Sequence, residues 1–417
     1  MDNTQETYSQ DLSRLKRKNY YMYDQYGNNP MDPVGPIGLI ALKGTIDLTK
    51  NVNERLKERR EVYRPFIEKG ELPERAGFLR DDYMINVSYP RFDTGEGKAF
   101  INSTVRGHDL FIFVDVINYS CTYKFYGKDK VMTPDEHFQD LKRVIEAASG
   151  KARRINVIMP YLYEGRQHKR NSRESLDCAY MLEEIHRLGV DNIICFDTHD
   201  PRVFNAVPLS AFECIPSTYQ IIKSLFNKVD DIKLGENKLM IVSPDEGGIP
   251  RAMYYSAMLE APLSTFYKRR DYRNVVNGKN PIVAHEYLGV DCNGSDILII
   301  DDMISSGESM LDIARELKGR NANRIYCCSG FTLFTDGTEK FDQAYKDGLI
   351  DGVIGTNLIY LPDELKNKEW FICADFSKFL ALLVDAINHD ASLSPLVNPV
   401  EKIRKKINEY KSNQRKG

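Results

Sequence analysis

The stretch ILIIDDMISSGES, residues 297–309, decides how this chain is expected to fold. Its four leading apolar residues, three of them β-branched, predict a buried strand of a parallel sheet. Asp301 and Asp302 follow at the carboxyl end of this strand, where open α/β sheets bind their ligands. A phosphate on the small-residue turn would meet the positive end of the amphipathic helix that comes next. The carboxylates would repel that phosphate, so they suit hydroxyl groups or a metal ion.

The length and composition of the chain suit a two-domain protein without a strongly basic surface. It has 417 residues, of which 42% are hydrophobic and 28% charged, and its formal net charge is −3. This length accommodates two domains of ordinary size, and the near-neutral charge argues against a nucleic-acid binder. No apolar run approaches the roughly 18 residues that a membrane-spanning helix needs. Residues 1–18 lack the apolar core of a signal peptide, and the eight cysteines form no C-x-x-C pair. We therefore expect a cytoplasmic protein that binds neither membranes nor nucleic acid.

Short apolar runs alternate with amphipathic helices along most of the chain. This pattern predicts an α/β fold with two domains, each a mainly parallel sheet flanked by helices. The expected order is an N-terminal extension at 1–34, a first domain at 35–215 with a charged, solvated insertion at 57–82, a second domain at 216–374, a helix at 375–395 and a polar tail at 396–417. The helix at 375–395 could return to pack on the first domain. The lysine-rich tail is expected to form a solvated helix.

Three polar segments have the chemistry to bind a nucleotide. Residues 160–170, PYLYEGRQHKR, follow a predicted strand, and an arginine and an amide there could bind phosphate and an adenine edge. Lys268, Arg269 and Arg270 repel one another unless an anion arrives, which suits a mobile loop closing on a polyphosphate. Residues 91–96, RFDTGE, form a hairpin-like element whose Phe92 could stack on a base. Taken singly, each segment is also explained by an ordinary exposed loop or hairpin.

Two further loops suit a metal ion. His199 lies between carboxylates in the sequence DTHD, residues 197–200, and could bind a divalent cation or a phosphate, although a solvated loop histidine would look the same. In SPDEGG, residues 243–248, the glycines allow a ligand to approach the backbone, and Asp245 could orient a hydroxyl or hydrated Mg²⁺. Because these loops follow separate strands, an α/β fold would gather them at one edge of a sheet. Together they predict phosphoryl transfer between a nucleotide and a sugar phosphate.

In order, the segments RFDTGE, RGHD, PYLYEGRQHK, DTH, SPDEGG, YKRR and IDDMISSGES resemble the motif series of the ribose-phosphate diphosphokinases, whose domains have the type I phosphoribosyltransferase fold. The resemblance extends from about Gly38 to His389. It implies transfer of the diphosphoryl group of ATP to the 1-hydroxyl of ribose 5-phosphate, with release of AMP and with Mg²⁺ as cofactor. It also implies a homo-oligomer, either a dimer or a hexamer.

The resemblance carries roles over to individual positions. It implies ATP binding by Arg166 and Gln167, adenine contacts from a neighbouring subunit by Phe92 and Glu96, Mg²⁺ binding by His199 and Asp245, catalytic charge stabilisation by Lys268 and Arg270, ribose hydroxyl binding by Asp301 and Asp302, and 5-phosphate binding by Ser305, Ser306, Gly307 and Ser309. Physical chemistry supports this division of roles. Attack by a neutral hydroxyl on a polyanion needs cations that neutralise charge and an in-line arrangement of the reactants.

Several residues depart from the family pattern. Ser305 replaces a frequent Asp, Glu308 replaces a frequent Gly, His168 stands where an Asp follows the Arg-Gln pair, Thr94 replaces an acidic or amide residue, and Pro208 and Phe212 occupy two positions of the metal segment. An inward-facing carboxylate at Glu308 would repel a phosphate strongly in a medium of low dielectric constant, so we expect it to point outward. Two alternatives stay open: a catalytically weak regulatory paralogue that binds sugar phosphate or nucleotide, and a less favoured salvage phosphoribosyltransferase.

Overall fold

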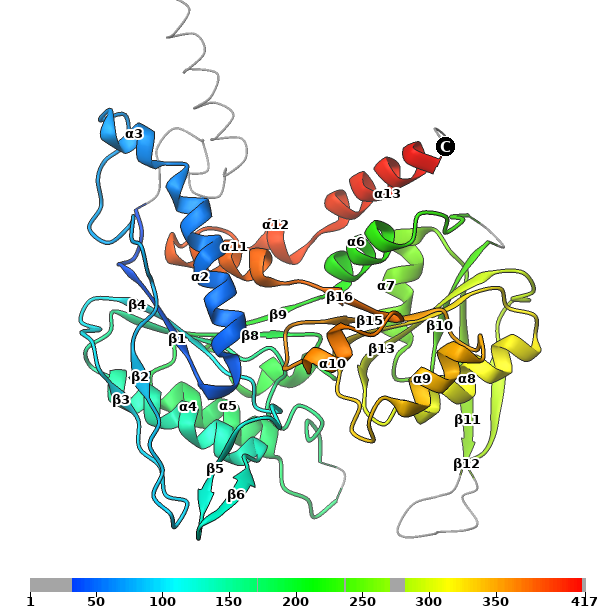
Figure 1. Ribbon diagram of the computed structural model, residues 1–417, viewed down its shortest axis with the longest axis horizontal. Helices are drawn as coiled ribbons and strands as arrows, with labels where there is room; N and C mark the ends of the chain where they lie inside the picture. The colour runs from blue at the N-terminus through cyan, green and yellow to red at the C-terminus, as the bar shows by residue number, and fades with distance from the viewer. Residues whose placement is uncertain (1–31, 171, 236–237, 271–281, 415–417) are drawn as a thin grey trace, which may run out of the picture. The chain divides into compact units, whose positions relative to one another are not determined.

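The computed structural model describes residues 32–170, 172–235, 238–270 and 282–414 (Figure 1). Almost all of the predicted N-terminal extension therefore lies outside the described residues. The chain forms two compact units. Unit 1 contains the chain up to Cys195, Asp200–Ile215 and Ser377–Asn398, and unit 2 contains Phe196–His199, Pro216–Phe376 and the chain from Pro399. Within the described ranges, no helix is long and apolar enough to cross a membrane.

Unit 1 is built on a five-stranded sheet with the order β1-β4-β7-β8-β9. The strands are β1 (Ile37–Ala41), β4 (Asp109–Phe113), β7 (Arg154–Ile158), β8 (Asn192–Phe196) and β9 (Ala211–Ile215), and the first four pair in parallel. Its helices are α2 (Ile46–Glu61), α3 (Arg64–Glu68), α4 (Pro134–Ala148), α5 (Asp177–Arg187), α11 (Ser377–Asn388) and α12 (Ser394–Val397), with short 3-10 helices η2 (Lys43–Thr45) and η3 (Pro201–Ala206). Two hairpins, β2 (Val87–Ser88) with β3 (Phe100–Ile101) and β5 (Thr122–Phe125) with β6 (Lys128–Val131), complete the unit.

Unit 2 has a seven-stranded sheet with the order β12-β11-β10-β13-β14-β15-β16. The strands are β10 (Leu239–Ser243), β11 (Leu263–Arg270), β12 (Ile282–Leu288), β13 (Asp296–Ile304), β14 (Ile325–Thr332), β15 (Gly352–Thr356) and β16 (Phe371–Ala374), and only β12 pairs antiparallel. Its helices are α6 (Thr218–Lys228), α7 (Ile249–Leu259), α8 (Glu308–Gly319), α9 (Glu339–Lys346), α10 (Asp363–Lys366) and α13 (Val400–Gln414). The predicted α/β class, with mainly parallel sheets flanked by helices, is confirmed.

Local sequence patterns account for the start of helix α4 and for which residues of the helices and strands are buried. Helix α4 begins after Thr133, whose side chain and Glu136 form a reciprocal capping box, with Pro134 at the first helical position. Its Phe138, Leu141, Val144 and Ile145 are buried, as predicted from their spacing. The central strands β10 and β14 are buried along their whole length, which explains their nearly continuous apolar sequences.

The predicted insertion at 57–82 is not solvated throughout. Arg60, in α2, is 1% exposed and donates from Nε to Asp385 Oδ1 at 3.0 Å and from Nη2 to Asn388 Oδ1 at 2.8 Å. Its guanidinium carbon lies 4.4 Å from the ring centroid of Phe78, which is also buried. Asp385 and Asn388 belong to α11, more than three hundred positions later in the chain. A charged run in the sequence therefore hides a buried ion pair, whose partner no local pattern could identify.

The prediction that the tail helix is solvated is also wrong for one face of the helix. Helix α13 buries Ile403, Ile407 and Tyr410 among its lysines. Tyr410 stacks on Phe226 of α6 with ring centroids 4.2 Å apart, and its hydroxyl donates to the Val229 carbonyl at 2.7 Å. The three apolar residues are spaced four and three apart, which places them on one helical face. The tail is therefore an amphipathic helix that packs within unit 2.

Candidate active site

The acid pair lies inside the carboxyl-terminal part of β13, because the strand continues past the predicted apolar run to Ile304. Asp301 is opposite Ser329 of the parallel neighbour β14. The backbone N–H of Asp302 donates to Asp301 Oδ1 at 2.8 Å, and that of Met303 donates to Asp302 Oδ1 at 3.0 Å. Asp302 is buried and Asp301 is half-buried. Backbone donors therefore hold both carboxylates in place at the centre of the sheet.

His199 and Asp302, predicted for different ligands, are in direct contact within unit 2. The imidazole Nδ1 of His199 lies 2.8 Å from Asp302 Oδ2. Burial by itself would raise the pKa of Asp302, but the hydrogen bond with His199 and the charge of Arg251 bring it below its ordinary value. Burial and the charge of Asp302 raise the pKa of Asp301 well above its ordinary value. The pair thus combines one firmly held negative charge with a neighbouring carboxyl group that takes up a proton more readily than an ordinary aspartate.

Arg251 is a site residue that the sequence reasoning missed. It lies in the first turn of α7, and its Nη2 donates to the Thr198 carbonyl at 3.5 Å. Its positive charge favours the ionisation of Asp197, Asp301 and Asp302, whereas burial opposes the ionisation of all three. Asp197 is itself held by the Ser217 N–H at 3.1 Å and has a left-handed φ of 39°. The sequence does mark this position, because Arg251 comes three positions after a glycine pair and at the start of a predicted helix.

The predicted phosphate loop runs from β13 directly into α8. Gly307 has φ 79°, and a Cβ there would lie 2.2 Å from the Phe341 ring, so this position requires glycine. Ser305 and Ser306 are half-buried, and Ser309 is exposed in the first turn of the helix. The Ser305 carbonyl accepts the Thr335 N–H at 3.0 Å, which anchors the loop to the segment after β14. The serines and the start of α8 therefore form a small-residue turn suited to an anion.

Glu308 points outward, as expected. Its side chain is 68% exposed, and its Oε1 lies 3.2 Å from Lys340 Nζ. Because this ion pair directs the carboxylate toward α9, the departure from the family glycine does not place a negative charge in the loop. The Glu308 carboxylate therefore lies at the surface of unit 2.

The loop after β10 holds Asp245 through short-range contacts. β10 is the parallel neighbour of β13, so Asp245 and the acid pair follow adjacent strands at the same edge of the sheet. The Gly248 N–H donates to Asp245 Oδ1 at 3.2 Å, and the Ser243 hydroxyl donates to the Asp245 carbonyl at 2.7 Å. A Cβ at Gly248 would lie 2.7 Å from Ser243 Oγ. The second glycine of SPDEGG is therefore needed for this turn.

The donor set for a metal is small. Among the described residues, no group of three or more His, Cys, Asp or Glu side chains is arranged to hold a metal ion. Mg²⁺ commonly uses one or two carboxylates and completes its shell with water and substrate phosphates. The hydrogen bond of His199 to Asp302 is the kind that orients a metal-ligating imidazole. His199 and Asp245 are thus compatible with Mg²⁺ that is bound mainly by its substrate.

Lys268 and Arg270 lie at the end of strand β11, whereas the sequence placed them in a loop. The strand continues because β12 pairs with it antiparallel, bringing Lys268 opposite His285 and Arg270 opposite Ile282. The register shifts between Arg269 and Arg270. Since β11 is the parallel neighbour of β10, the backbone of these residues approaches the same sheet edge as Asp245. The predicted polar stretch at 271–281 lies outside the described residues.

The predicted ATP-binding residues belong to unit 1 and lie on two loops. Arg166 is exposed, and Gln167 uses its Nε2 to donate to the Ser175 carbonyl at 2.8 Å. On the other loop, Phe92 is 51% exposed with the Lys98 ammonium 5.2 Å from its ring centroid. Glu96 is exposed and accepts from the Thr94 hydroxyl at 3.0 Å. Both loops thus present polar or aromatic side chains outward.

The remaining departures have local explanations within unit 1. His168 Nε2 lies 3.4 Å from Asp200 Oδ2. The hydrogen bond from Arg202 lowers the pKa of Asp200, so this carboxylate stays charged beside the imidazole. Phe212 packs against the core of the unit, while Pro208 is exposed before β9. Phe212 is therefore a core contact, and Pro208 lies at the surface of unit 1.

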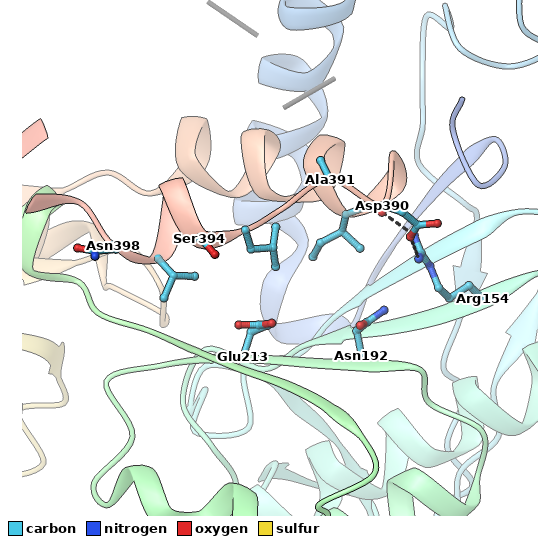
Figure 2. A pocket seen from close by; sticks show the side chains of 10 residues that line it. Arg154, Asn192, Glu213, Asp390, Ala391, Ser394 and Asn398 are labelled. Atoms are coloured by element: carbon cyan, nitrogen blue, oxygen red, sulfur yellow. Dashed lines mark hydrogen bonds and ion pairs between the residues drawn. The ribbon is translucent and has the colours of Figure 1, made fainter. Parts of the chain in front are cut away.

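A groove of about 550 Å³ opens on unit 1, and none of the predicted site residues lines it (Figure 2). It is lined by Arg154, Asn192, Glu213, Ile387, Asp390, Ala391, Leu393, Ser394, Val397 and Asn398. Figure 2 shows the side chains of Glu213 and Asn192 facing the segment that follows α11. Burial raises the pKa of Glu213. The Arg154–Asp390 ion pair closes one end of the groove.

Known proteins resemble this chain over most of its length. A family model described as the N-terminal domain of ribose phosphate pyrophosphokinase matches residues 37–189, and a phosphoribosyl transferase domain model matches residues 209–350. Together they match more than half of the chain. The ribose-phosphate pyrophosphokinase of Vibrio parahaemolyticus is 27% identical over 335 residues, covering 78% of this chain and 96% of that protein. That of Staphylococcus aureus strain Mu50 is 28% identical over 284 residues, covering 67% and 79%.

The fold comparison agrees with the sequence comparison. The crystal structure of phosphoribosylpyrophosphate synthetase from Mycobacterium smegmatis matches with a TM-score of 0.65 at 17% identity, covering 85% of this chain and all of that one. The structural match supports the fold, and the two family models together cover parts of both α/β units. The chain belongs to the family of ribose-phosphate pyrophosphokinases.

Proposed function

We propose that the protein transfers the diphosphoryl group of ATP to the 1-hydroxyl of ribose 5-phosphate, giving phosphoribosyl diphosphate and AMP. The observation that carries this proposal is the sequence of sites along β13 and α8. Fixed carboxylates at Asp301 and Asp302 are followed at once by a serine-rich turn at a helix start. That order suits a molecule with a diol at one end and a phosphate at the other. Family membership supplies the reaction.

Each residue of the acceptor site has a role that its chemistry explains. The carboxylates of Asp301 and Asp302 accept hydrogen bonds from the ribose 2- and 3-hydroxyls, which leaves the 1-hydroxyl facing the donor. Ser305, Ser306, Gly307 and Ser309 hold the 5-phosphate through hydroxyl and backbone N–H donors. The hydrogen bond between His199 and Asp302 couples the sugar site to the proposed metal position.

The donor side is proposed from residue identity and strand position. Arg166 and Gln167 bind ATP, Phe92 and Glu96 contact adenine, and Lys268 and Arg270 stabilise the charge that develops on the transferred group and on AMP. His199 and Asp245 would hold Mg²⁺ together with the ATP phosphates, and the ion would supply positive charge that offsets the charge of the polyphosphate. We also propose a homo-oligomer, a dimer or a hexamer, in which Phe92 and Glu96 serve a neighbouring subunit.

A reducing compartment, and hence the cytoplasm, is proposed from the cysteines. All eight are free thiols, and six of them are buried. Burial raises the pKa of Cys327 to about 12 and that of Cys178 to about 12, which keeps these thiols protonated and unreactive.

One assay tests the reaction directly. The full chain is incubated with ATP, Mg²⁺ and ribose 5-phosphate, and AMP and phosphoribosyl diphosphate are quantified together. We expect the two products in equal amounts. The Lys268→Ala variant is the control, with activity lower by about 10²–10³-fold, the usual effect of removing one group that stabilises transition-state charge. AMP production no greater than in this variant would contradict the proposal and favour a regulatory paralogue.

A further inference from the structure

The β5–β6 hairpin of unit 1 has an unusual two-residue loop. Tyr126 and Gly127 connect the strands with φ values of 47° and 76°. This geometry belongs to the type I′ loop, which favours Asn-Gly because both residues adopt the left-handed region. A tyrosine in the first position is strained. Tyr126 is nevertheless 73% exposed, and its ring has an edge-to-face contact with Phe125 at a centroid distance of 5.0 Å, so burial in a core does not explain the choice.

The hairpin holds the turn at residues 91–96 that carries Phe92 and Glu96. The Tyr126 N–H donates to the Asp93 carbonyl at 2.9 Å, and the two segments lie side by side (Figure 1). A Cβ placed on Gly95 would lie 3.2 Å from the Phe125 ring. Arg91 donates to the Gly95 carbonyl at 3.1 Å, and its guanidinium carbon lies 4.9 Å from the Tyr123 ring centroid. The turn is thus supported by backbone, ring and cation contacts from one hairpin.

The base of the hairpin is fixed to helix α4. Lys130 Nζ lies 2.9 Å from Glu136 Oε1, and the Tyr123 hydroxyl bonds to the same carboxylate. The Lys130 ammonium also lies 5.2 Å from the Phe125 ring centroid. Burial opposes ionisation of Glu136, but these hydrogen bonds and the Thr133 N–H lower its pKa to about 2. The hairpin is therefore held at its base by contacts with α4, and its exposed end carries Tyr126.

We propose that the β5–β6 hairpin is a second nucleobase-recognition element, which positions the turn at residues 91–96 and supplies the Tyr126 ring as an additional stacking surface for a purine nucleotide. This inference rests on the proposed function. Phe92 and Tyr126 are both exposed aromatic residues. Their segments are joined by the hydrogen bond from the Tyr126 N–H to the carbonyl of Asp93, the residue after Phe92. Aromatic rings bind bases by stacking, and strained residues persist at binding sites where their side chains are used.

The test separates a binding role from a structural one. Tyr126→Asn removes the ring and places a residue that tolerates the left-handed region in the loop. We expect the melting temperature to rise, because strain is relieved. The dissociation constant for Mg·ATP, measured by calorimetry on the full chain without ribose 5-phosphate, should rise by about fivefold or more. If Tyr126 had only a structural role, its replacement would not raise the melting temperature and weaken ATP binding at the same time.

Two matched variants complete the experiment. Tyr126→Phe keeps the ring and should retain wild-type affinity, and Tyr180→Ala removes an exposed ring from α5 and should also bind ATP normally. An unchanged ATP affinity in Tyr126→Asn would overturn the inference alone if the wild type forms AMP from ribose 5-phosphate. A wild type that binds ATP but forms no AMP would overturn the proposed reaction and leave the binding result to decide the inference. A wild type that does not bind ATP overturns both.

Discussion

Two clusters of buried charge differ in how completely they are neutralised. In unit 1, Asp385 is fully buried and faces Arg59 at 2.7 Å and Arg60 at 2.9 Å. Burial opposes its ionisation, yet these cations and His389 lower its pKa to about 2. In unit 2, Asp197, Asp301 and Asp302 share the charge of Arg251, and burial raises the pKa of Asp197 and Asp301. The carboxylate of the first cluster therefore has two arginine partners, whereas the three carboxyl groups of the second lie around Arg251 and His199.

This difference distinguishes structural from functional charge. A buried ion pair with matched partners holds elements together, as Arg60 and Asp385 hold α2 and α11. Carboxylates left with excess negative charge at the end of a central strand are poised for hydroxyl donors or a cation, and such perturbed groups mark binding sites. Substitution should therefore affect stability in the first cluster and substrate binding in the second.

The largest effect is expected from Asp385→Ala. It leaves Arg60 buried without its carboxylate, and breaking a buried pair in this way costs about 3–5 kcal/mol of unfolding free energy. Urea denaturation of the full chain measures the loss. The matched control is Asp363→Ala, which removes an exposed partner of Lys366 and should leave the unfolding free energy nearly unchanged. Equal losses in the two variants would contradict the distinction.

Asp302→Asn, in the second cluster, should act mainly on substrate binding. Removing a charged acceptor of the ribose hydroxyls weakens ribose 5-phosphate binding by about 10–100-fold, corresponding to about 1.5–3 kcal/mol for hydrogen bonds to a charged group. The KM for ATP should change little, because Asp302 is assigned to the sugar and not to the nucleotide. Steady-state kinetics with each substrate varied separately gives both constants. Asp312→Asn, on the exposed face of α8, is the control, and an unchanged sugar KM in Asp302→Asn would remove the proposed role.

Acid should weaken the structural cluster in a defined pH window. The folded pKa of Asp385, about 2, is lower than the ordinary value of 3.8, so its contribution to stability is present above about pH 4. The contribution is lost as the pH falls from about 4 toward 2, where the carboxylate becomes protonated. Unfolding free energies of the wild type and Asp385→Asn should therefore converge across this window. A constant difference between them down to pH 2 would show that Asp385 is not the titrating group.

Much of this arrangement could be predicted from local sequence patterns, and the remainder depends on long-range contacts. The order of strands and helices, the acid pair and the loops at strand ends follow from periodicity and turn residues. The burial of Arg60 could not be predicted, because Asp385 lies 325 positions away. The contact of His199 with Asp302 spans 103 positions and joins two motifs that were assigned separately. The extension of β11 through Lys268 required its pairing with β12, which overrides the polar character of the segment.

Glu308 provides the smallest expected effect and a third kind of charge, exposed and paired only at the surface. Its ion pair with Lys340 is worth about 1 kcal/mol or less, since both side chains are solvated. Glu308→Gln should therefore change the unfolding free energy by about 1 kcal/mol or less and the KM for ribose 5-phosphate by less than about twofold, in contrast to Asp302→Asn. Lys340→Gln tests the pair from its other side. If it raised the sugar KM while Glu308→Gln lowered it, the carboxylate would be turning toward the 5-phosphate when unpaired, and Lys340 would belong to the functional cluster.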